Sequence, residues 1–65
     1  MPLLSDADLW RTADIMIDSH GSNAPAVATG WAEWLEASGD EEGAATWQLI
    51  AQRCEALLNE EGTRQ

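Results

Sequence analysis

The segment LEASGDEEGA, residues 35–44, decides the fold, because it ends one helix and begins another within a few residues. Gly39 suits the position just after a helix C-terminus, where a positive φ favours glycine. Asp40 has the carboxylate typical of an N-cap, and Glu41 and Glu42 place negative charge in a first turn, where the helix dipole favours it. The segment therefore predicts two helices with a very short connection, which makes them antiparallel neighbours.

Apolar residues on both sides of this connection repeat with the period of a helix. A helix expected over residues 24–38 has one apolar face, made of Ala24, Val27, Ala28, Trp31 and Leu35. A helix expected over residues 40–60 has another, made of Ala44, Trp47, Ile50, Ala51, Cys54, Leu57 and Leu58. Gly62 is expected to end this second helix. Gly30 weakens the middle of the first and is a candidate for a close helix–helix approach.

A further helix is expected upstream, over residues 6–20. Ser5 is suited to its N-cap, and an acidic residue follows three positions later. One face comprises Asp6, Leu9, Trp10, Ala13, Met16, Ile17 and His20. His20 in the last turn can interact with the negative end of the helix dipole, and Gly21 can adopt the left-handed conformation that ends a helix. Pro25 then falls in the first turn of the next helix, where it costs no hydrogen bond.

These patterns predict an all-α fold. The expected architecture is a small three-helix bundle over the three ranges above, or a helical hairpin plus an arm that completes its core in a dimer. Residues 1–65 form a single domain in this interpretation, with frayed ends at about 1–4 and 61–65. A core of this size supplies only about 3–5 kcal/mol without a disulfide, a metal or a partner chain. Association with another chain is therefore expected on energetic grounds.

The charge of the chain contrasts with its aromatic content. Twelve acidic residues stand against three arginines and no lysine, a formal net charge of −9, yet the chain has four tryptophans. High net charge favours disorder unless apolar mass allows collapse, which these residues supply. Neither a nucleic-acid backbone nor an anionic membrane surface would attract such a protein. Since no stretch is typical of a membrane span or a secretory signal, we expect a cytoplasmic protein.

The side chains that could carry chemistry do not form a pattern typical of an enzyme. Cys54 fits an apolar stripe as a core residue, and His20 fits the end of its helix, so neither is expected to be catalytic. Asp14 and Asp18 lie one turn apart with His20 nearby, but Ca²⁺ requires more oxygen ligands than they offer. No cysteine pair suits zinc, and no glycine-rich loop with a lysine suits a nucleotide. We therefore expect no enzyme, cofactor or metal site.

One series of capping and packing residues extends along most of the chain. It comprises Leu9-Trp10, His20-Gly21, Ala24, Ala28, Ala32, Leu35, Gly39-Asp40, Gly43, Trp47, Ile50 and Leu57. This series resembles that of a family of short bacterial proteins of unknown function, in which three helices are joined by a His-Gly turn and a Gly-Asp turn. The resemblance implies an all-α fold and a bacterial or phage origin, and it implies no activity. Trp31, where the family's pattern would have a polar or basic residue, departs from it.

Pairs of carboxylates one turn apart suggest a binding surface. They are Asp14 and Asp18, and Glu33 and Glu36, and the adjacent Glu41 and Glu42 add negative charge where the last helix begins. Carboxylates three or four residues apart on a helix lie roughly 5–6 Å apart at Cβ, so such ladders can imitate a run of phosphates. A rigid acidic protein of this kind can occupy a basic groove and be steered into it. The alternative interpretation is that the charge only keeps the protein in solution.

The tryptophans suggest where a partner would dock. Trp10 and Trp47 are expected in the core, and Trp31 is compatible with the core as well. Trp34 lies about 60° from Trp31 around the helix, at the rim of the apolar stripe. A partly exposed tryptophan is typical of an interface anchor. Two further apolar residues are expected to point away from their helices' apolar faces, namely Ile15 and Leu49.

These features predict a small, acidic, non-enzymatic protein-binding module. Its sharpest form is a phage-type inhibitor, an anti-CRISPR-like decoy that mimics nucleic acid and blocks a basic nucleic-acid-binding protein or nuclease complex. The predicted partner-binding residues are Trp31, Trp34, Asp14, Asp18, Glu33, Glu36, Glu41 and Glu42. The alternative is a self-associating homodimer of structural role, whose acidity serves solubility.

Overall fold

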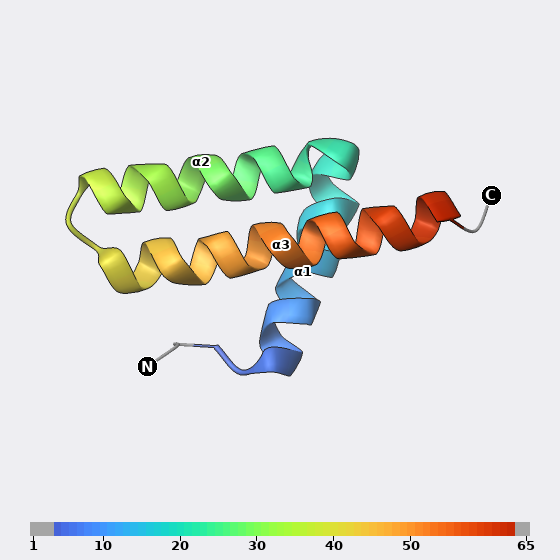
Figure 1. Ribbon diagram of the computed structural model, residues 1–65, viewed down its shortest axis with the longest axis horizontal. Helices are drawn as coiled ribbons and strands as arrows, with labels where there is room; N and C mark the ends of the chain where they lie inside the picture. The colour runs from blue at the N-terminus through green and yellow to red at the C-terminus, as the bar shows by residue number, and fades with distance from the viewer. Residues whose placement is uncertain (1–3, 64–65) are drawn as a thin grey trace.

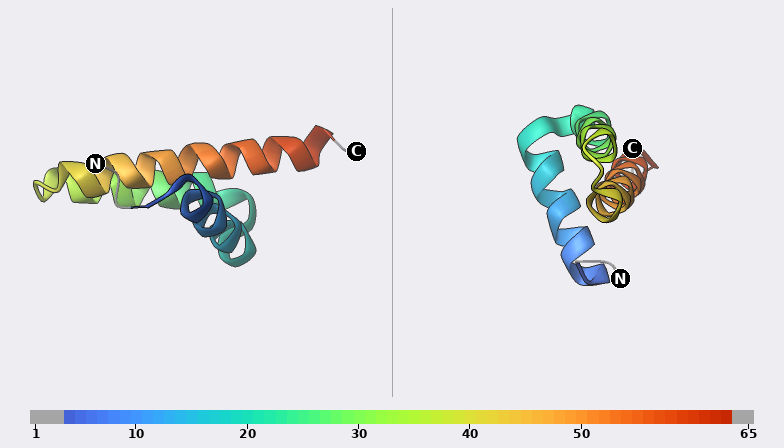
Figure 2. Two further views of the ribbon diagram at one scale, coloured as in Figure 1. Left: turned by 90° about the horizontal axis from the view of Figure 1, so that it is seen from below. Right: turned by 90° about the vertical axis from the view of Figure 1, so that its left-hand side faces the viewer.

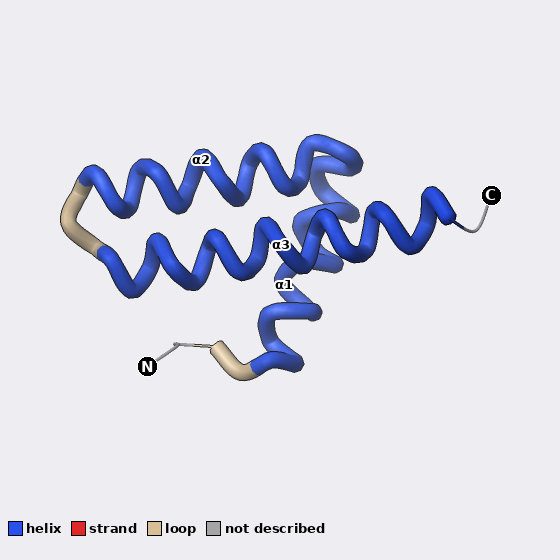
Figure 3. Tube along the Cα trace, in the orientation of Figure 1, coloured by secondary structure: helices blue, strands red, loops and turns tan. Residues whose placement is uncertain are grey.

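The structure is a computed structural model that describes residues 4–63, with side chains described up to residue 60. These residues form an all-α chain (Figure 1). Helix α1 spans Asp6–His20, α2 spans Ala24–Ala37 and α3 spans Glu41–Thr63, with a 3₁₀ turn, η1, at Gly21–Asn23. No strand occurs within residues 4–63 (Figure 3). The predicted all-α fold is confirmed.

The first two helical segments are not separate helices. Because η1 follows α1 directly and leads directly into α2, the chain forms one bent helical segment from Asp6 to Ala37, and α3 is the second. Gly21 lies at the bend with a φ of 60°, and its N–H donates to the carbonyl of Ile17. Its ψ of −136° lies outside the left-handed helical region, so only the predicted sign of φ is confirmed. Pro25 lies in the first turn of α2, as expected.

Helices α2 and α3 form an antiparallel hairpin, as the sequence of the connection predicts (Figure 1). Gly39 has a φ of 91°, and the N–H of Asp40 donates to the carbonyl of Leu35 at 2.9 Å. Asp40 in turn caps α3, since its Oδ1 accepts a hydrogen bond from the N–H of Gly43 at 2.9 Å. Both ends of the connection are therefore satisfied by residues within it.

The far end of α3 differs from the sequence expectation. The helix continues through Gly62 to Thr63, so Gly62 does not end it. A glycine ends a helix where its φ becomes positive, as at Gly21 and Gly39, and otherwise only weakens the helix. Of the ends predicted to fray, about 1–4 and 61–65, residues 1–3 and 64–65 lie outside the described residues, whereas residues 61–63 continue α3 and Leu4 packs against the core. In the described part of the chain, no helix combines the length and apolarity needed to cross a membrane.

Helix α1 crosses the hairpin at a steep angle instead of running alongside it (Figures 1 and 2). It contacts α3 more extensively than α2. The core lies at this crossing and consists largely of small side chains, Leu9, Ala13, Met16, Ala24, Ala28, Ile50, Ala51 and Cys54. The arrangement is thus a helical hairpin with α1 as an arm across it.

The crossing of α1 changes the environment of two residues from that predicted. Leu49 does not point away from the core, because α1 covers the side of α3 that α2 leaves open, and Leu49 packs there. Trp10 is not a core residue but is 37% exposed, with the Arg53 guanidinium 5.0 Å from the centroid of its ring. The same guanidinium binds Asp6 at 2.9 Å. Ile15 is exposed, as predicted.

Candidate functional site

Two tryptophans on α2 form an exposed aromatic pair. Trp31 is 49% exposed and Trp34 is 60% exposed. Their ring centroids lie 5.9 Å apart and their planes meet at 86°, an edge-to-face contact. This geometry is favourable for aromatic rings, so each ring restricts the other. The exposure of Trp34 agrees with its predicted place at the rim, whereas Trp31 is far more exposed than a core residue.

The pair is connected to the interior through a third tryptophan. Trp47, on α3, lies with its ring centroid 6.3 Å from that of Trp31 at an interplanar angle of 31°. It is half-buried and packs against the core cluster, which agrees with its predicted role. Trp31 is therefore held from two sides, by Trp47 beneath it and by Trp34 beside it.

An open apolar groove adjoins the pair. Its volume is about 540 Å³, and its lining residues are Val27, Gly30, Trp31 and Trp34, which we call the α2 groove. Gly30 does not mark a close approach of helices, contrary to the prediction, because a Cβ at this position would meet no heavy atom within 4 Å. The missing side chain leaves open space between Val27 and Trp34, one helical turn to either side.

The local sequence of α2 explains why these tryptophans are exposed. Its buried stripe consists only of alanines, Ala24, Ala28 and Ala32, spaced four residues apart. Small side chains of this kind allow close packing against a neighbouring helix, and Trp31 and Trp34 lie beside this stripe and not on it. The large side chains follow a second stripe on the flank of the helix. The sequence contains a signal of this exposure, because α2 has an alanine stripe and, next to it, a stripe of larger side chains that includes Trp31 and Trp34.

The six predicted partner-binding carboxylates are all exposed but lie on different elements. Asp14 and Asp18 lie on α1, Glu33 and Glu36 on α2, and Glu41 and Glu42 in the first turn of α3. Only Glu33 and Glu36 share a helix with the tryptophan pair. By helical geometry, Asp14 and Asp18 face away from the buried side of α1. The carboxylates therefore lie on three different elements and do not form one ladder.

The single cysteine and the single histidine do not form a shared site. Cys54 is fully buried, and its Sγ lies 3.8 Å from the carbonyl oxygen of Ala13, which confirms it as a core residue. Burial, with a smaller contribution from Glu55, raises the pKa of the Cys54 thiol, so the thiolate that a nucleophile needs is disfavoured. His20 lies in the last turn of α1, as predicted, but it is exposed, whereas the sequence placed it on the apolar face of the helix. Within the described part of the chain, no group of three or more His, Cys, Asp or Glu could hold a metal ion.

The α2 groove is thus an open apolar feature beside the two exposed tryptophans, and it lies on a helix that also carries two exposed carboxylates. The predicted family resemblance rests on residues with capping and packing roles, such as Gly39, Asp40 and Ala28, which many helical folds share. In comparisons with known proteins, no family model, no curated protein and no solved structure matches this chain.

Proposed function

We propose that this protein is a non-enzymatic protein-binding module and that the α2 groove is its docking surface. The observation that supports this proposal is the exposed, edge-to-face pair formed by Trp31 and Trp34. Tryptophans dominate interface hot spots because they bury a large area and lose little conformational freedom. A domain of 65 residues has little stability to spare, and the part of each indole that stays exposed adds nothing to it. Partner binding gives these side chains a role that folding does not.

The partner in this proposal is a protein whose basic surface surrounds an apolar projection. The chain has a net charge of −9, and Glu33 and Glu36 lie on the same helix as the tryptophans. Opposite charge steers association and raises its rate, more than it raises the final affinity. Nucleic-acid-binding proteins and nuclease complexes present such basic surfaces. An anti-CRISPR-like, nucleic-acid-mimicking inhibitor of phage type is the sharpest form of the proposal.

In this form the tryptophans provide the central contact and the carboxylates provide negative charge at several places, because the six carboxylates lie on three different elements. Asp14 and Asp18 lie on the arm, and Glu41 and Glu42 lie where the hairpin turns. At about 0.1 M salt, exposed charges act over only about 10 Å. Carboxylates far from the bound surface would therefore contribute to steering and not to contact.

Self-association is the second candidate function. The same groove could pair with that of a second copy, which would cover four indoles at once and give a bundle of helices from two chains. The net charge of the protein opposes this arrangement, because a dimer would bring together a charge of 2 × (−9) = −18. Whichever of the two functions holds, we propose that the protein is cytoplasmic and that its three helical segments pack as one small bundle.

The proposal can be tested by affinity capture from bacterial lysate at increasing salt, with bound proteins identified by mass spectrometry. The variants are Trp34→Ala and, as a matched control, Ile15→Ala, which removes an exposed apolar side chain from α1. Capture of a basic nucleic-acid-binding protein that is weakened by Trp34→Ala but not by Ile15→Ala, and that nucleic acid competes away, would support the proposal. Equal capture by all three proteins would contradict it. Recovery of this protein alone, with a dimer in analytical ultracentrifugation, would favour self-association.

A further inference from the structure

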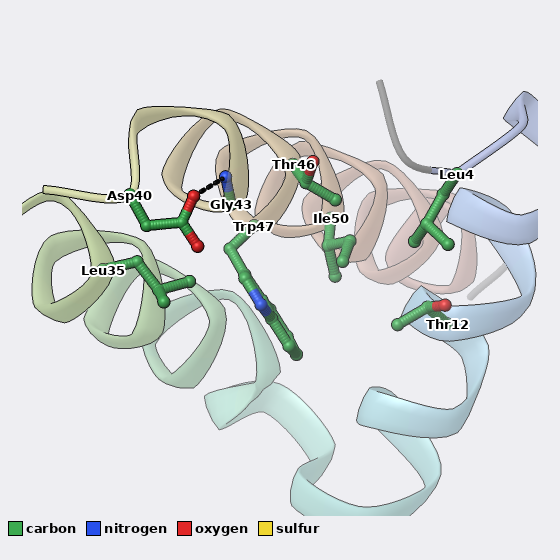
Figure 4. A pocket seen from close by; sticks show the side chains of 8 residues that line it. All are labelled: Leu4, Thr12, Leu35, Asp40, Gly43, Thr46, Trp47 and Ile50. Carbon is green, nitrogen blue, oxygen red and sulfur yellow. Dashed lines mark hydrogen bonds between the residues drawn. The ribbon is translucent and has the colours of Figure 1, made fainter. Parts of the chain in front are cut away.

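A second cavity lies where the arm meets the hairpin, beside Trp47. Its volume is about 340 Å³, within the size range of small-molecule sites, and it opens between α1, the end of α2 and the start of α3 (Figure 4). Its apolar walls are formed by Leu35, Trp47 and Ile50. The polar residues that line it are Asp40, Thr12 and Thr46. It shares no lining residue with the α2 groove.

Apart from the indole N–H of Trp47, the side-chain polar atoms that line this cavity are hydrogen-bond acceptors. The hydroxyl of Thr12 donates its proton to the carbonyl of Asp8 at 2.8 Å, and that of Thr46 donates to the carbonyl of Glu42 at 2.9 Å. Each hydroxyl oxygen therefore retains only lone pairs to offer to a ligand. Of the Asp40 carboxylate, Oδ1 accepts from the N–H of Gly43, and Oδ2 accepts from no residue within the described chain. A ligand that fits this set must be a donor.

Gly43 determines where the free carboxylate oxygen lies. A Cβ on residue 43 would lie 2.5 Å from Oδ2 of Asp40, closer than such atoms approach. The absence of a side chain thus lets the carboxylate fold down onto the first turn of α3, at the wall of the cavity. Figure 4 shows the carboxylate of Asp40 and the indole of Trp47 on the same side of this space.

Charge and aromatic character restrict the ligand further. An ammonium group can interact with the face of an indole as well as with a carboxylate, so Trp47 and Asp40 both favour a cation. The net charge of −9 repels anions from the whole molecule. The apolar side chains of Leu35 and Ile50 favour a ligand with an apolar body beside its charged group.

We propose that this cavity binds a small organic cation, an ammonium group carried on an aromatic or branched apolar body. The ammonium group donates to Oδ2 of Asp40 and to the threonine oxygens, and the apolar body packs against Trp47 and Leu35. This inference does not depend on the proposed docking function, since the two surfaces use different residues.

The experiment is an NMR titration of the full chain, following the indole N–H of Trp47 and the amide of Gly43. The probes share one body and differ in charge, namely phenethylammonium, 2-phenylethanol and 3-phenylpropionate. We expect saturable shifts at both groups with the cation, binding roughly tenfold weaker for the neutral alcohol, and none for the anion. Asp40→Asn should reduce the affinity for the cation to that for the alcohol. Asparagine is as good an N-cap as aspartate, so this variant keeps the fold.

The matched control is Glu41→Gln. It removes the same charge from the residue next to Asp40, and the side chain of Glu41 does not line the cavity. It should keep the preference for the cation. An equal loss in Glu41→Gln and Asp40→Asn would overturn the proposal, because the cation would then respond only to the overall field. No saturable shift with any probe, or equal affinity for all three, would overturn it as well. Thermal melts of both variants establish that they are folded.

Discussion

The ring of Trp34 meets the ring of Trp31 edge to face, with centroids 5.9 Å apart and planes at 86°. On its other side, Trp31 lies 6.3 Å from Trp47, which packs against the core. The contacts of the two exposed tryptophans are therefore unequal: Trp31 has aromatic neighbours on both sides, and Trp34 has one. Substitution of Trp31 should therefore affect stability more than substitution of Trp34 does.

Trp34→Ala should change the free energy of unfolding by less than about 1 kcal/mol, because it removes one aromatic contact from a side chain that is mostly exposed. Trp31→Ala should cost about 1–2 kcal/mol, since it removes two such contacts. Urea denaturation followed by far-UV circular dichroism measures both. A larger loss in Trp34→Ala than in Trp31→Ala would contradict this order. If Trp34 anchors a partner, its substitution should reduce the free energy of binding by far more than it reduces the free energy of unfolding.

The cap formed by Asp40 should be coupled to Gly43. Asp40→Ala should cost about 1 kcal/mol, whereas Asp40→Asn should be nearly neutral. Gly43→Ala should destabilise the protein, despite the higher helix propensity of alanine, because the new Cβ would displace the Asp40 carboxylate. In the Asp40→Ala background the same change should become stabilising. Thermal melts of the four proteins give this double-mutant cycle, and additive effects would show that the two residues are not coupled.

Ile50 should be the most sensitive core position. It is 1% exposed and is among the largest fully buried side chains of the described residues. Ile50→Ala should cost about 2–5 kcal/mol, which matches the whole stability expected of a core this small. Ile50→Val should cost only about 0.5–1.5 kcal/mol and remain folded. Calorimetry of both variants tests this, with Ile15→Ala as the exposed control.

Cys54 should make stability decrease at alkaline pH. Burial raises the pKa of its thiol in the folded state, so the folded state keeps the proton where the unfolded state loses it. The resulting stabilisation is complete below the unfolded thiol pKa of about 8.5 and is lost as pH rises through the folded value. The chain has no lysine and no tyrosine, so no other side chain titrates between about pH 8 and 11. Denaturation at pH 7 and pH 10 should show the loss, and Cys54→Ala should abolish it. Iodoacetamide should modify the folded wild type slowly and the unfolded chain rapidly.

The helical segments and the hairpin connection follow from local sequence. Ser5 accepts a hydrogen bond from the N–H of Asp8 at 3.2 Å, and Asp40 accepts one from Gly43, as N-caps should. Gly21 and Gly39 have the positive φ expected where a helix ends or bends. These features depend on a few neighbouring residues, so the sequence predicts them well. Glycine alone was not sufficient, since Gly62, which was expected to end α3, stays within it.

The candidate site was predicted only in part, because some of its features depend on contacts between helices and not on local sequence. The helical period places Trp34 at the rim of α2, and its exposure agrees with that position. The exposure of Trp31 depends on how closely the alanine stripe of α2 approaches α3, which the period alone does not define. The contact between Trp31 and Trp47 joins two helices, so local sequence contains no direct signal of it.

The sequence by itself determined that this protein is helical, where its helices begin and end to within a few residues, and that α2 and α3 pair. Only the tertiary structure decided that α1 crosses the hairpin (Figure 2), that Leu49 is partly buried against the core, and that Trp10 lies under Arg53 at the surface. Caps and periodicity act over one or two turns, and they leave the crossing angle of an arm undetermined. That angle depends on which side chains of different helices fit together, and it exists only once the core has formed.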